Sequence, residues 1–189
     1  MIIAGIDYSM TSPGIAIYDT SKELNYENVY FHGFSSTKKH PGRKDMNMTV
    51  HRLPKIWKSD ESRYRWIASA VISILNGKGV GIAAVEGLSM GSRSGMMLNV
   101  AQNQGELRQQ LEKQAIEFIL LAPTSVKKHF QGKGNATKQQ MIDKFIEKTG
   151  VSLGKKVGTT KYGGPVSDLV DAYAIVSQLY DLHIKRRIV

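Results

Sequence analysis

The sequence predicts a mixed α/β protein, in which antiparallel strands come first, parallel strands follow, and helices cover the sheet. Two short runs rich in β-branched residues, at 2–7 and about 14–19, flank a turn of Ser, Thr, Pro and Gly and indicate a hairpin. The apolar runs at 80–85 and 117–121 alternate with segments long enough for helices, as parallel strands do. The last apolar pattern, from Val166 to about Arg186, predicts a terminal helix.

The totals are typical of one globular domain spanning residues 1–189, because 41% of the residues are hydrophobic. No apolar run approaches the roughly 20 residues that span a bilayer, and the N-terminal run has no basic flank. We therefore expect neither a membrane segment nor a signal peptide. The chain has no cysteine, which excludes disulfides, thiolate metal sites and cysteine nucleophiles, and is compatible with a cytoplasmic protein.

The net charge of +10 is the most informative of these totals. Such an excess on a small domain indicates a polyanionic partner, most often nucleic acid. An anionic membrane surface is the competing interpretation, but no strongly amphipathic basic helix supports it.

The first half of the chain continues with a third strand at 26–33 and then a segment, 35–59, without clear periodicity. This segment is either a solvated connection or a loop that contacts nucleic acid, and the total charge favours the second interpretation. A helix from Asp60, its expected N-cap, to about Leu75 follows, and Asn76-Gly77 ends it. Its expected buried face consists of Tyr64, Ile67, Ala68, Val71, Ile72 and Leu75.

The second half alternates helices and strands. We expect a buried parallel strand over 80–85, a flexible segment over 87–95 and a helix over about 96–114. A second buried strand is expected at 117–121, followed by a short helix from Pro123 to Phe130 and a helix from a Thr137 cap to Lys148. The Gly- and Lys-rich stretch 151–165 predicts a loop or a hairpin.

Two of the predicted strands end on an acid, Asp7 and Glu86. Asp7 by itself fits either a turn-capping residue or a carboxylate that faces a metal or a phosphate. Functional residues collect at the carboxyl ends of strands in open α/β sheets, so adjacent strands would place both acids at one edge. The terminal helix adds Asp168 and Asp171, which share a face; Asp168 also suits a helix N-terminus, whereas Asp171 falls close to a buried face.

Four carboxylates brought together would repel one another unless divalent cations balanced them. Mg²⁺ and Mn²⁺ prefer such oxygen ligands. Two ions about 3.5–4 Å apart can activate a water and stabilise the leaving oxygen of a phosphodiester. The acids and the basic charge together therefore predict a nuclease whose surface binds nucleic acid.

The order of these features resembles the RuvC family of Holliday-junction resolvases, within the RNase H-like nuclease superfamily. The resemblance spans nearly the whole chain: a GID segment at 5–7, an apolar strand ending in Glu86, and D-x-x-D-A at 168–172. Residues 132–138 (GKGNATK) also resemble the family's basic G-x-G-x-A-x-K segment, preceded by a P-x-x-V-K-K element at 123–128.

The resemblance implies an RNase H-like fold and an endonuclease that cleaves four-way or other branched DNA. It implies Asp7, Glu86, Asp168 and Asp171 as catalytic residues and ligands of two Mg²⁺ or Mn²⁺ ions, and a homodimer that cuts opposite strands. Lys133 and Lys138 become expected contacts to DNA phosphates near the cut. We expect further basic side chains to bind DNA with them: Lys127, Lys128 and Arg93.

Some positions depart from the family pattern. Tyr8-Ser9-Met10 follow the first Asp where the family often has Pro-Gly-Ser, and Leu88-Ser89-Met90 replace the aromatic wedge of cellular members. The segments 35–59 and 151–165 resemble insertions relative to compact members. These departures indicate a divergent, phage-type branch with broader specificity for branched DNA.

Other interpretations of the function stay open at this point. An actin-like ATPase also begins with an Asp-bearing hairpin, but it needs a second Gly-rich phosphate loop, and the sequence contains none. A non-catalytic nucleic-acid-binding module would make the four acids incidental. The sequence distinguishes poorly between a resolvase and a related RNase H-like nuclease that acts on RNA or on replication or packaging intermediates. The Met- and Leu-rich stripe over 96–111 fits a core or, in part, a dimer interface.

Overall fold

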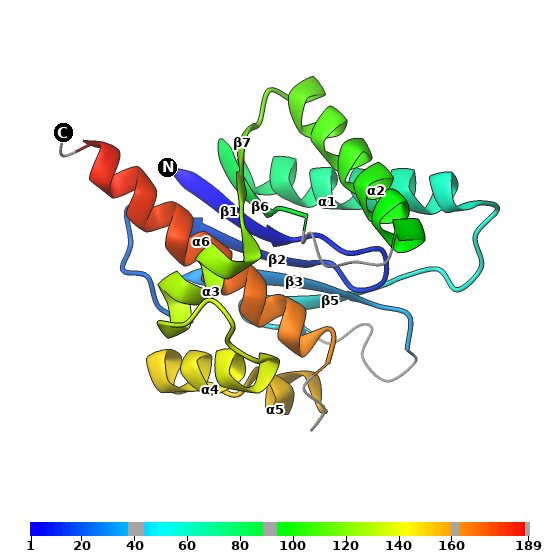
Figure 1. Cartoon of the computed structure of the whole chain (residues 1–189). Coiled ribbons are helices and arrows are strands. Elements are labelled where there is room, and N and C mark those ends of the chain that lie inside the picture. The colour runs from blue at the N-terminus through cyan, green and yellow to red at the C-terminus, as the bar shows by residue number, and fades with distance from the viewer. Residues whose placement is uncertain (38–43, 89–93, 160–162, 188–189) are drawn as a thin grey trace.

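The computed structural model describes residues 1–37, 44–88, 94–159 and 163–187, and within them a mixed sheet of seven strands forms the centre (Figure 1). The order across the sheet is β4-β5-β3-β2-β1-β6-β7. The strands are β1 (Ile2–Asp7), β2 (Gly14–Asp19), β3 (Val29–Ser35), β4 (Lys44–Asp45), β5 (Met48–Arg52), β6 (Ile82–Glu86) and β7 (Glu117–Leu121).

The helices lie on both faces of the sheet (Figure 1). They are α1 (Asp60–Lys78), α2 (Ser94–Lys113), α3 (Pro123–Gln131), α4 (Lys138–Thr149), α5 (Leu153–Val157) and α6 (Val166–Arg187). One apolar core lies between the sheet and the pair α1 and α2, and a second core lies between the sheet and α3, α4, α5 and α6. This layered arrangement confirms the predicted mixed α/β fold, and no helix of the described residues has the length and apolarity to cross a bilayer.

Strand directions decide where the loops gather. β1, β2 and β3 are antiparallel to one another in turn, as predicted, and β6 and β7 continue parallel to β1. β5 is parallel to β3. The strands β1, β3, β5, β6 and β7 therefore share one direction, and their carboxyl ends lie at the same edge of the sheet, which we call the carboxyl edge.

The helix α1 closely follows the prediction. All six residues of the expected apolar face are buried, because they recur with the helical period against the sheet. Its N-cap, however, is Ser59 and not Asp60: the Ser59 side chain accepts from the backbone N–H of Ser62, and Ser62 donates back in a capping box. The helix also continues past the predicted stop at Asn76-Gly77 to Lys78, and Gly79, whose φ is 66°, closes its last turn.

The segment 35–59 is wrongly predicted as an irregular loop. Its middle forms β5, in which Met48 and Val50 are 2% and 1% exposed and pair with β3. The alternation of two buried residues over five is too short to stand out among the surrounding basic residues. Residues 38–43 of this segment lie outside the described part of the chain, and they include three basic residues, Lys38, Lys39 and Arg43.

Three further expectations are corrected. The stretch 151–165 contains the one-turn helix α5, held by the buried Leu153 and Val157 and capped by Ser152. The strand at 117–121 is not buried on both sides, since Leu120 is 45% exposed. β7 is the outermost strand beyond β6, so one of its faces has little cover. The third strand begins at Val29, later than predicted, because residues 25–28 form a turn in which Asn25 accepts from the N–H of Asn28.

Candidate active site

Asp7 and Glu86 end two adjacent parallel strands. β1 and β6 pair in a register that sets Ile6 opposite Val85, so the next residue of each strand is Asp7 and Glu86 respectively. Neighbouring strands lie about 4.8 Å apart, which brings the two backbone positions side by side at the carboxyl edge. The predicted adjacency of the two acids is thereby explained by the register.

Both acids project from the face that α6 covers. Side chains alternate along a strand, so Asp7 shares a face with Ile3 and Gly5, and Glu86 shares one with Ala84. Ile3 and Ala84 are part of the core under α6. The two carboxylates therefore point toward the helix that carries the other pair of acids.

Glycines let α6 lie unusually close to the sheet. A Cβ on Gly5 would come within 2.4 Å of the Ala172 carbonyl oxygen and of the Val176 nitrogen. A Cβ on Gly14 would come within 2.2 Å of the Asp168 carbonyl oxygen. Gly14 pairs with Asp7 across β1 and β2, so the start of α6 lies over the position of Asp7. Backbone contact thus sets the depth at which the acids of α6 enter the site.

Asp168 lies deepest of the acids on α6, at 8% exposure. Its Oδ1 accepts a hydrogen bond of 3.0 Å from the hydroxyl of Ser167. Its buried Oδ2 makes no hydrogen bond within the described residues, and a Cβ on Gly164 would come within 2.4 Å of it. A buried carboxylate oxygen without a donor is costly, and it is the kind of atom that a cation would satisfy. Asp171, one turn further on, is half-buried.

Charge repulsion and burial perturb the acids together. Burial, and then the charges of Glu86, Asp168 and Asp171, raise the pKa of Asp7 well above its usual value. Burial and the charge of Asp171 raise the pKa of Glu86 to about 7. Burial and the charge of Asp168 raise the pKa of Asp171 to about 6. The structure therefore brings all of the predicted acids within electrostatic reach of one another.

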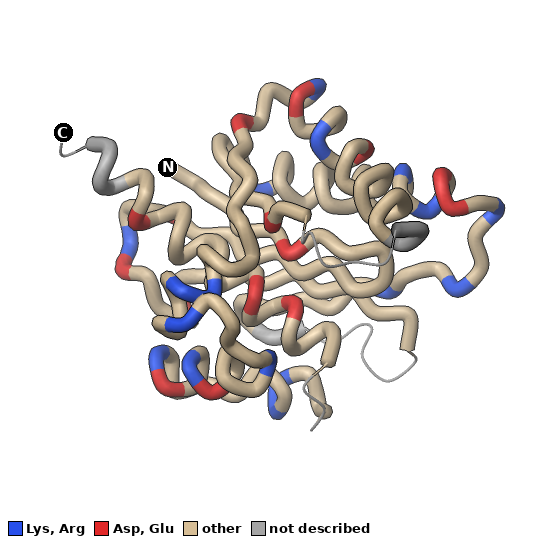
Figure 2. Tube along the Cα trace, in the orientation of Figure 1, with Lys and Arg blue, Asp and Glu red and all other residues tan. Residues whose placement is uncertain are grey.

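The predicted DNA-binding lysines divide into two groups. Lys138, at the start of α4, lowers the pKa values of Asp7, Glu86 and Asp171, and Lys127 of α3 lowers those of the last two, so both face the acids. Lys128 and Lys133 are exposed on α3 and on the turn after it. Arg93 lies outside the described residues. Figure 2 shows acidic positions (red) between the strand ends and the start of α6, with basic positions (blue) nearby on α3.

The four acids have the ligand chemistry that divalent cations prefer, but the described residues do not form a complete coordination sphere around one ion. Within residues 1–37, 44–88, 94–159 and 163–187, no group of three or more His, Cys, Asp or Glu has the arrangement to hold one ion. Mg²⁺ characteristically takes one or two carboxylates and completes its shell with water and substrate phosphates. Clustered carboxylates with raised pKa values, and the unpaired Oδ2 of Asp168, suit that mode of binding.

Residues that the motifs did not predict support the site from α2. The side-chain amide of Gln104 donates a 2.7 Å hydrogen bond to the backbone carbonyl oxygen of Glu86. Its neighbour Asn103 is fully buried, and neither atom of its amide finds a partner in the described residues. On the same side, burial and the charge of Glu106 raise the pKa of Tyr8. In the sequence, the only sign of these residues is that Asn103 and Gln104 are polar residues within an apolar helical stripe.

The stripe itself divides between core and surface. Leu107 and Leu111 are fully buried against α1 and the sheet, whereas Leu98, near the start of α2, is 61% exposed.

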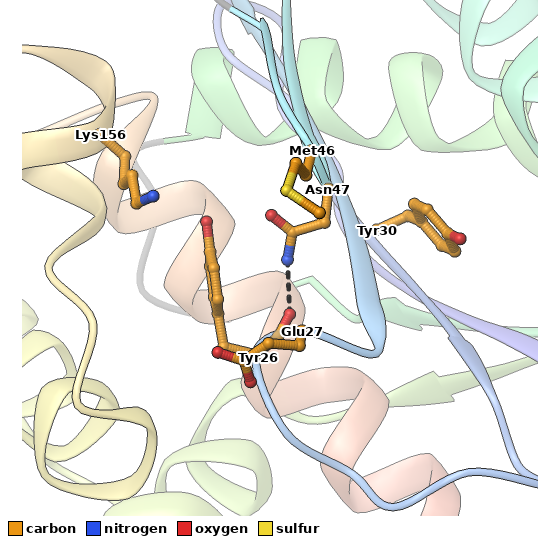
Figure 3. A pocket seen from close by; sticks show the side chains of 6 residues that line it. All are labelled: Tyr26, Glu27, Tyr30, Met46, Asn47 and Lys156. Carbon is orange, nitrogen blue, oxygen red and sulfur yellow. Dashed lines mark hydrogen bonds between the residues drawn. The ribbon is translucent and has the colours of Figure 1, made fainter.

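A separate cavity of about 310 Å³ lies near the amino ends of β3 and β5. It is lined by Tyr26, Glu27, Tyr30, Met46, Asn47 and Lys156 (Figure 3). The Asn47 amide donates to the backbone carbonyl oxygens of Tyr26, at 2.5 Å, and Val29, at 3.1 Å, which ties the two strand starts together. None of the four acids lines this cavity, so it is distinct from the candidate active site.

The chain is similar to several solved resolvases over nearly its full length. Thermus thermophilus RuvC in complex with a Holliday junction substrate superimposes with a TM-score of 0.65 at 17% identity, covering 98% of this chain and 96% of that one. The yeast mitochondrial Holliday junction resolvase gives 0.58 at 17% identity, covering 97% and 80%. The fowlpox virus resolvase bound to Holliday junction DNA gives 0.54 at 14% identity, covering 97% and 99%. These likenesses establish the shared RNase H-like fold.

Sequence comparison identifies the family. No curated protein matches the chain in a direct sequence search. The family model of the crossover junction endodeoxyribonuclease RuvC matches residues 33–149, which include Glu86 and the lysines of α3 and α4. Asp7, Asp168 and Asp171 lie outside the matched segment. Because the match covers more than half of the sequence, the chain belongs to the RuvC family of Holliday junction resolvases, which are crossover junction endodeoxyribonucleases.

Proposed function

We propose that Asp7, Glu86, Asp168 and Asp171 form the catalytic site and hold two Mg²⁺ or Mn²⁺ ions. The observation that carries this proposal is that the four acids converge: register sets Asp7 beside Glu86, and the start of α6 lies over the position of Asp7. Burial and mutual repulsion raise the pKa of Asp7, Glu86 and Asp171 accordingly. When bound, the two ions supply an activated water and a charge that stabilises the leaving oxygen of the phosphodiester.

The fold of the chain positions the charged side chains of the site. Register sets Asp7 beside Glu86, and the glycine contacts hold Asp168 and Asp171 of α6 over them. Lys127 and Lys138 offset part of the negative charge, and in DNA binding their ammonium groups attract the phosphate to a pocket that would otherwise repel it. Lys128, Lys133 and Arg93 extend this phosphate binding away from the acids.

The substrate that we propose is four-way or otherwise branched DNA. The Thermus and fowlpox relatives are described in complexes with Holliday junctions. The charge of +10 fits binding of several phosphates, and each neutralised phosphate contributes a slope of roughly −0.9 to the dependence of log affinity on log salt. We infer that such a protein meets its substrate in the cytoplasm and that residues 1–189 act as one domain, since α6, near the end of the chain, contacts β1, β2, β3 and β6 of its first half.

The active unit that we propose is a homodimer. A resolvase must cut two strands, and two copies related by a two-fold axis place one site on each. The exposed Leu98, with the half-buried Met97 and Val100 beside it near the start of α2, is an apolar residue that a second copy would cover.

Cleavage of synthetic substrates tests the proposal. Wild-type protein with Mg²⁺ or Mn²⁺ should nick a four-way junction faster than plain duplex, with a flap as the intermediate case, and should be inactive in EDTA. Asp7→Asn should bind the junction with unchanged affinity and salt slope but should not cut it. Glu112→Gln, an exposed acid of α2, serves as the matched control and should cut normally. Activity in EDTA, or normal cutting by Asp7→Asn, would contradict the two-metal site.

A further inference from the structure

A groove of about 490 Å³ opens at the carboxyl edge, on the side of the sheet that α1 covers. Three loops build it, and each follows a strand that ends at this edge: the turn after β1, the residues after β3, and the connection from β5 to α1. Its lining includes Met10, Thr37, Lys55, Trp57 and Arg63. In Figure 1 these loops lie at the same side of the sheet as the start of α6.

The groove and the acids lie along the same carboxyl edge, although the acids project from the face that α6 covers and the groove lies on the side that α1 covers. Glu86 and Asp7 end β6 and β1, while the groove lies at the ends of β3 and β5, two and three strands further along. With a strand spacing of about 4.8 Å, that offset is roughly 10–14 Å. Nucleotides of one strand rise about 3.4 Å in duplex DNA, so the groove lies a few nucleotides from a phosphate held at the acids.

The side chains of the groove are held in place. The Trp57 ring packs edge-on against Trp66, with 5.6 Å between the ring centroids. Arg63 pairs with Asp60 at 2.8 Å and donates to the Met10 sulfur at 3.7 Å, which links α1 to the turn after Asp7. The buried Nε–H of Arg63 has no acceptor within the described residues.

The composition of the groove matches that of a site for nucleic acid. Its lining among the described residues includes two cations, Lys55 and Arg63, and no acid, and Lys55 is exposed. Beside Lys55, Ile56 is 91% exposed, and the half-buried Trp57 follows. An aromatic ring next to cations is the arrangement on which proteins stack unpaired bases while they hold the backbone.

We propose that this groove binds the DNA strand that runs from the scissile phosphate along the carboxyl edge of the sheet. Lys55 and Arg63 contact its phosphates, and Trp57 contacts a base that is unstacked near the branch point. This inference rests on the proposed function, since it takes the four acids as the point of cleavage.

Fluorescence tests the contact at Trp57 directly, because the chain has only two tryptophans. Trp66→Phe leaves Trp57 as the sole reporter, and Trp57→Phe leaves Trp66; each change keeps an aromatic partner for the other ring. Titration with a four-way junction in EDTA should quench Trp57 strongly and Trp66 only weakly. Absence of quenching in the Trp66→Phe protein, under conditions where binding is saturated, would overturn the proposal.

Binding measurements test the phosphate contact. Lys55→Ala should weaken junction binding about tenfold and reduce the salt slope by roughly one. The control is Lys113→Ala, which removes an exposed lysine at the end of α2, next to the start of β7 and away from the carboxyl edge. Equal affinities and slopes for the two variants would contradict the groove.

Trp57→Ala should lower affinity for the junction about tenfold more than it lowers affinity for plain duplex. If that variant does not fold, the fluorescence of Trp66→Phe decides the question. These experiments test the groove and the active site independently. Normal binding by Lys55→Ala together with an inactive Asp7→Asn would refute the proposed groove alone. Normal cutting by Asp7→Asn would refute the active site instead.

Discussion

Glu86 shows at the level of one residue that bringing acids close together in the fold disfavours their charged forms. Its pKa is raised from 4.5 to about 7, and that of Asp171 from 3.8 to about 6. Between those limits the folded protein binds more protons than the unfolded chain does. Without metal ions, these two groups therefore reduce the free energy of unfolding as pH rises from about 4 to about 7.

This linkage predicts that the stability of wild type and of Glu86→Gln responds differently to pH. His32, whose pKa burial lowers to about 4, acts in the opposite direction over part of the same range. The melting temperature in EDTA should therefore be compared between wild type and Glu86→Gln. The advantage of the variant should grow as pH rises from 5 to 8 and reach a few degrees, since about 1 kcal/mol shifts Tm by roughly 2–4 °C at this size. An advantage that shrinks with rising pH would contradict the assigned repulsion.

Asp7 predicts opposite effects on stability and on activity. Asp7→Asn removes one of the repelling charges, so its Tm in EDTA at pH 8 should exceed that of wild type. Addition of Mg²⁺ or Mn²⁺ should then raise the Tm of wild type by more than that of the variant, because a ligand stabilises the state that binds it. The same change should lower the rate of junction cleavage at least about a hundredfold. A metal-dependent Tm increase of equal size in both proteins would show that the ions bind elsewhere.

At the scale of elements, the contact between α6 and the β1–β2 hairpin decides the geometry of the site. Gly14 has no space for a side chain, because the backbone of Asp168 occupies it. Gly14→Ala should push α6 outward, destabilise the protein by at least roughly 1–3 kcal/mol and reduce cleavage. The free energy of unfolding from denaturant titration measures the first effect.

Gly77 in α1 provides the control for that substitution. A Cβ at this exposed helical position meets nothing within 4 Å. Gly77→Ala should leave cleavage unchanged and stabilise the protein by about 0.4–1 kcal/mol. If Gly14→Ala were as well tolerated as Gly77→Ala, close helix–sheet approach could not be what positions Asp168.

At the scale of the whole molecule, paired incision requires two copies of the chain. Leu98→Lys places a charge at the exposed apolar position of α2 and should shift the protein toward a monomer in sedimentation experiments at micromolar concentration. The monomeric variant should still nick single strands but lose coordinated cutting of both strands. Lys113→Glu, at the other end of α2, is the control and should remain dimeric. A wild-type protein that stays monomeric both free and on DNA would rule out this form of paired cutting.

Much of this architecture could be predicted because its elements have strong local signals. The period of α1, the cap at Thr137 and the turn after β1 each follow from a few neighbouring residues. β5 and α5 were missed because two buried side chains in five residues do not make a period, and their stability comes from contacts with β3 and α6. The exposed face of β7 could not be predicted either, since a position at the edge of a sheet depends on strand order.

The chemistry of the candidate site follows from composition and residue order alone, because the four acids, the lysines and the basic total charge can all be seen in the sequence. The tertiary structure decided which of these groups face one another. Asp7 lies beside Glu86 through the pairing of two strands more than seventy residues apart, and Asp168 lies over both because two glycines admit a helix. The groove at Trp57 likewise exists only because the strands that precede its three loops all end at the carboxyl edge. Contacts of this kind depend on register and on the depth of packing, which no local pattern encodes.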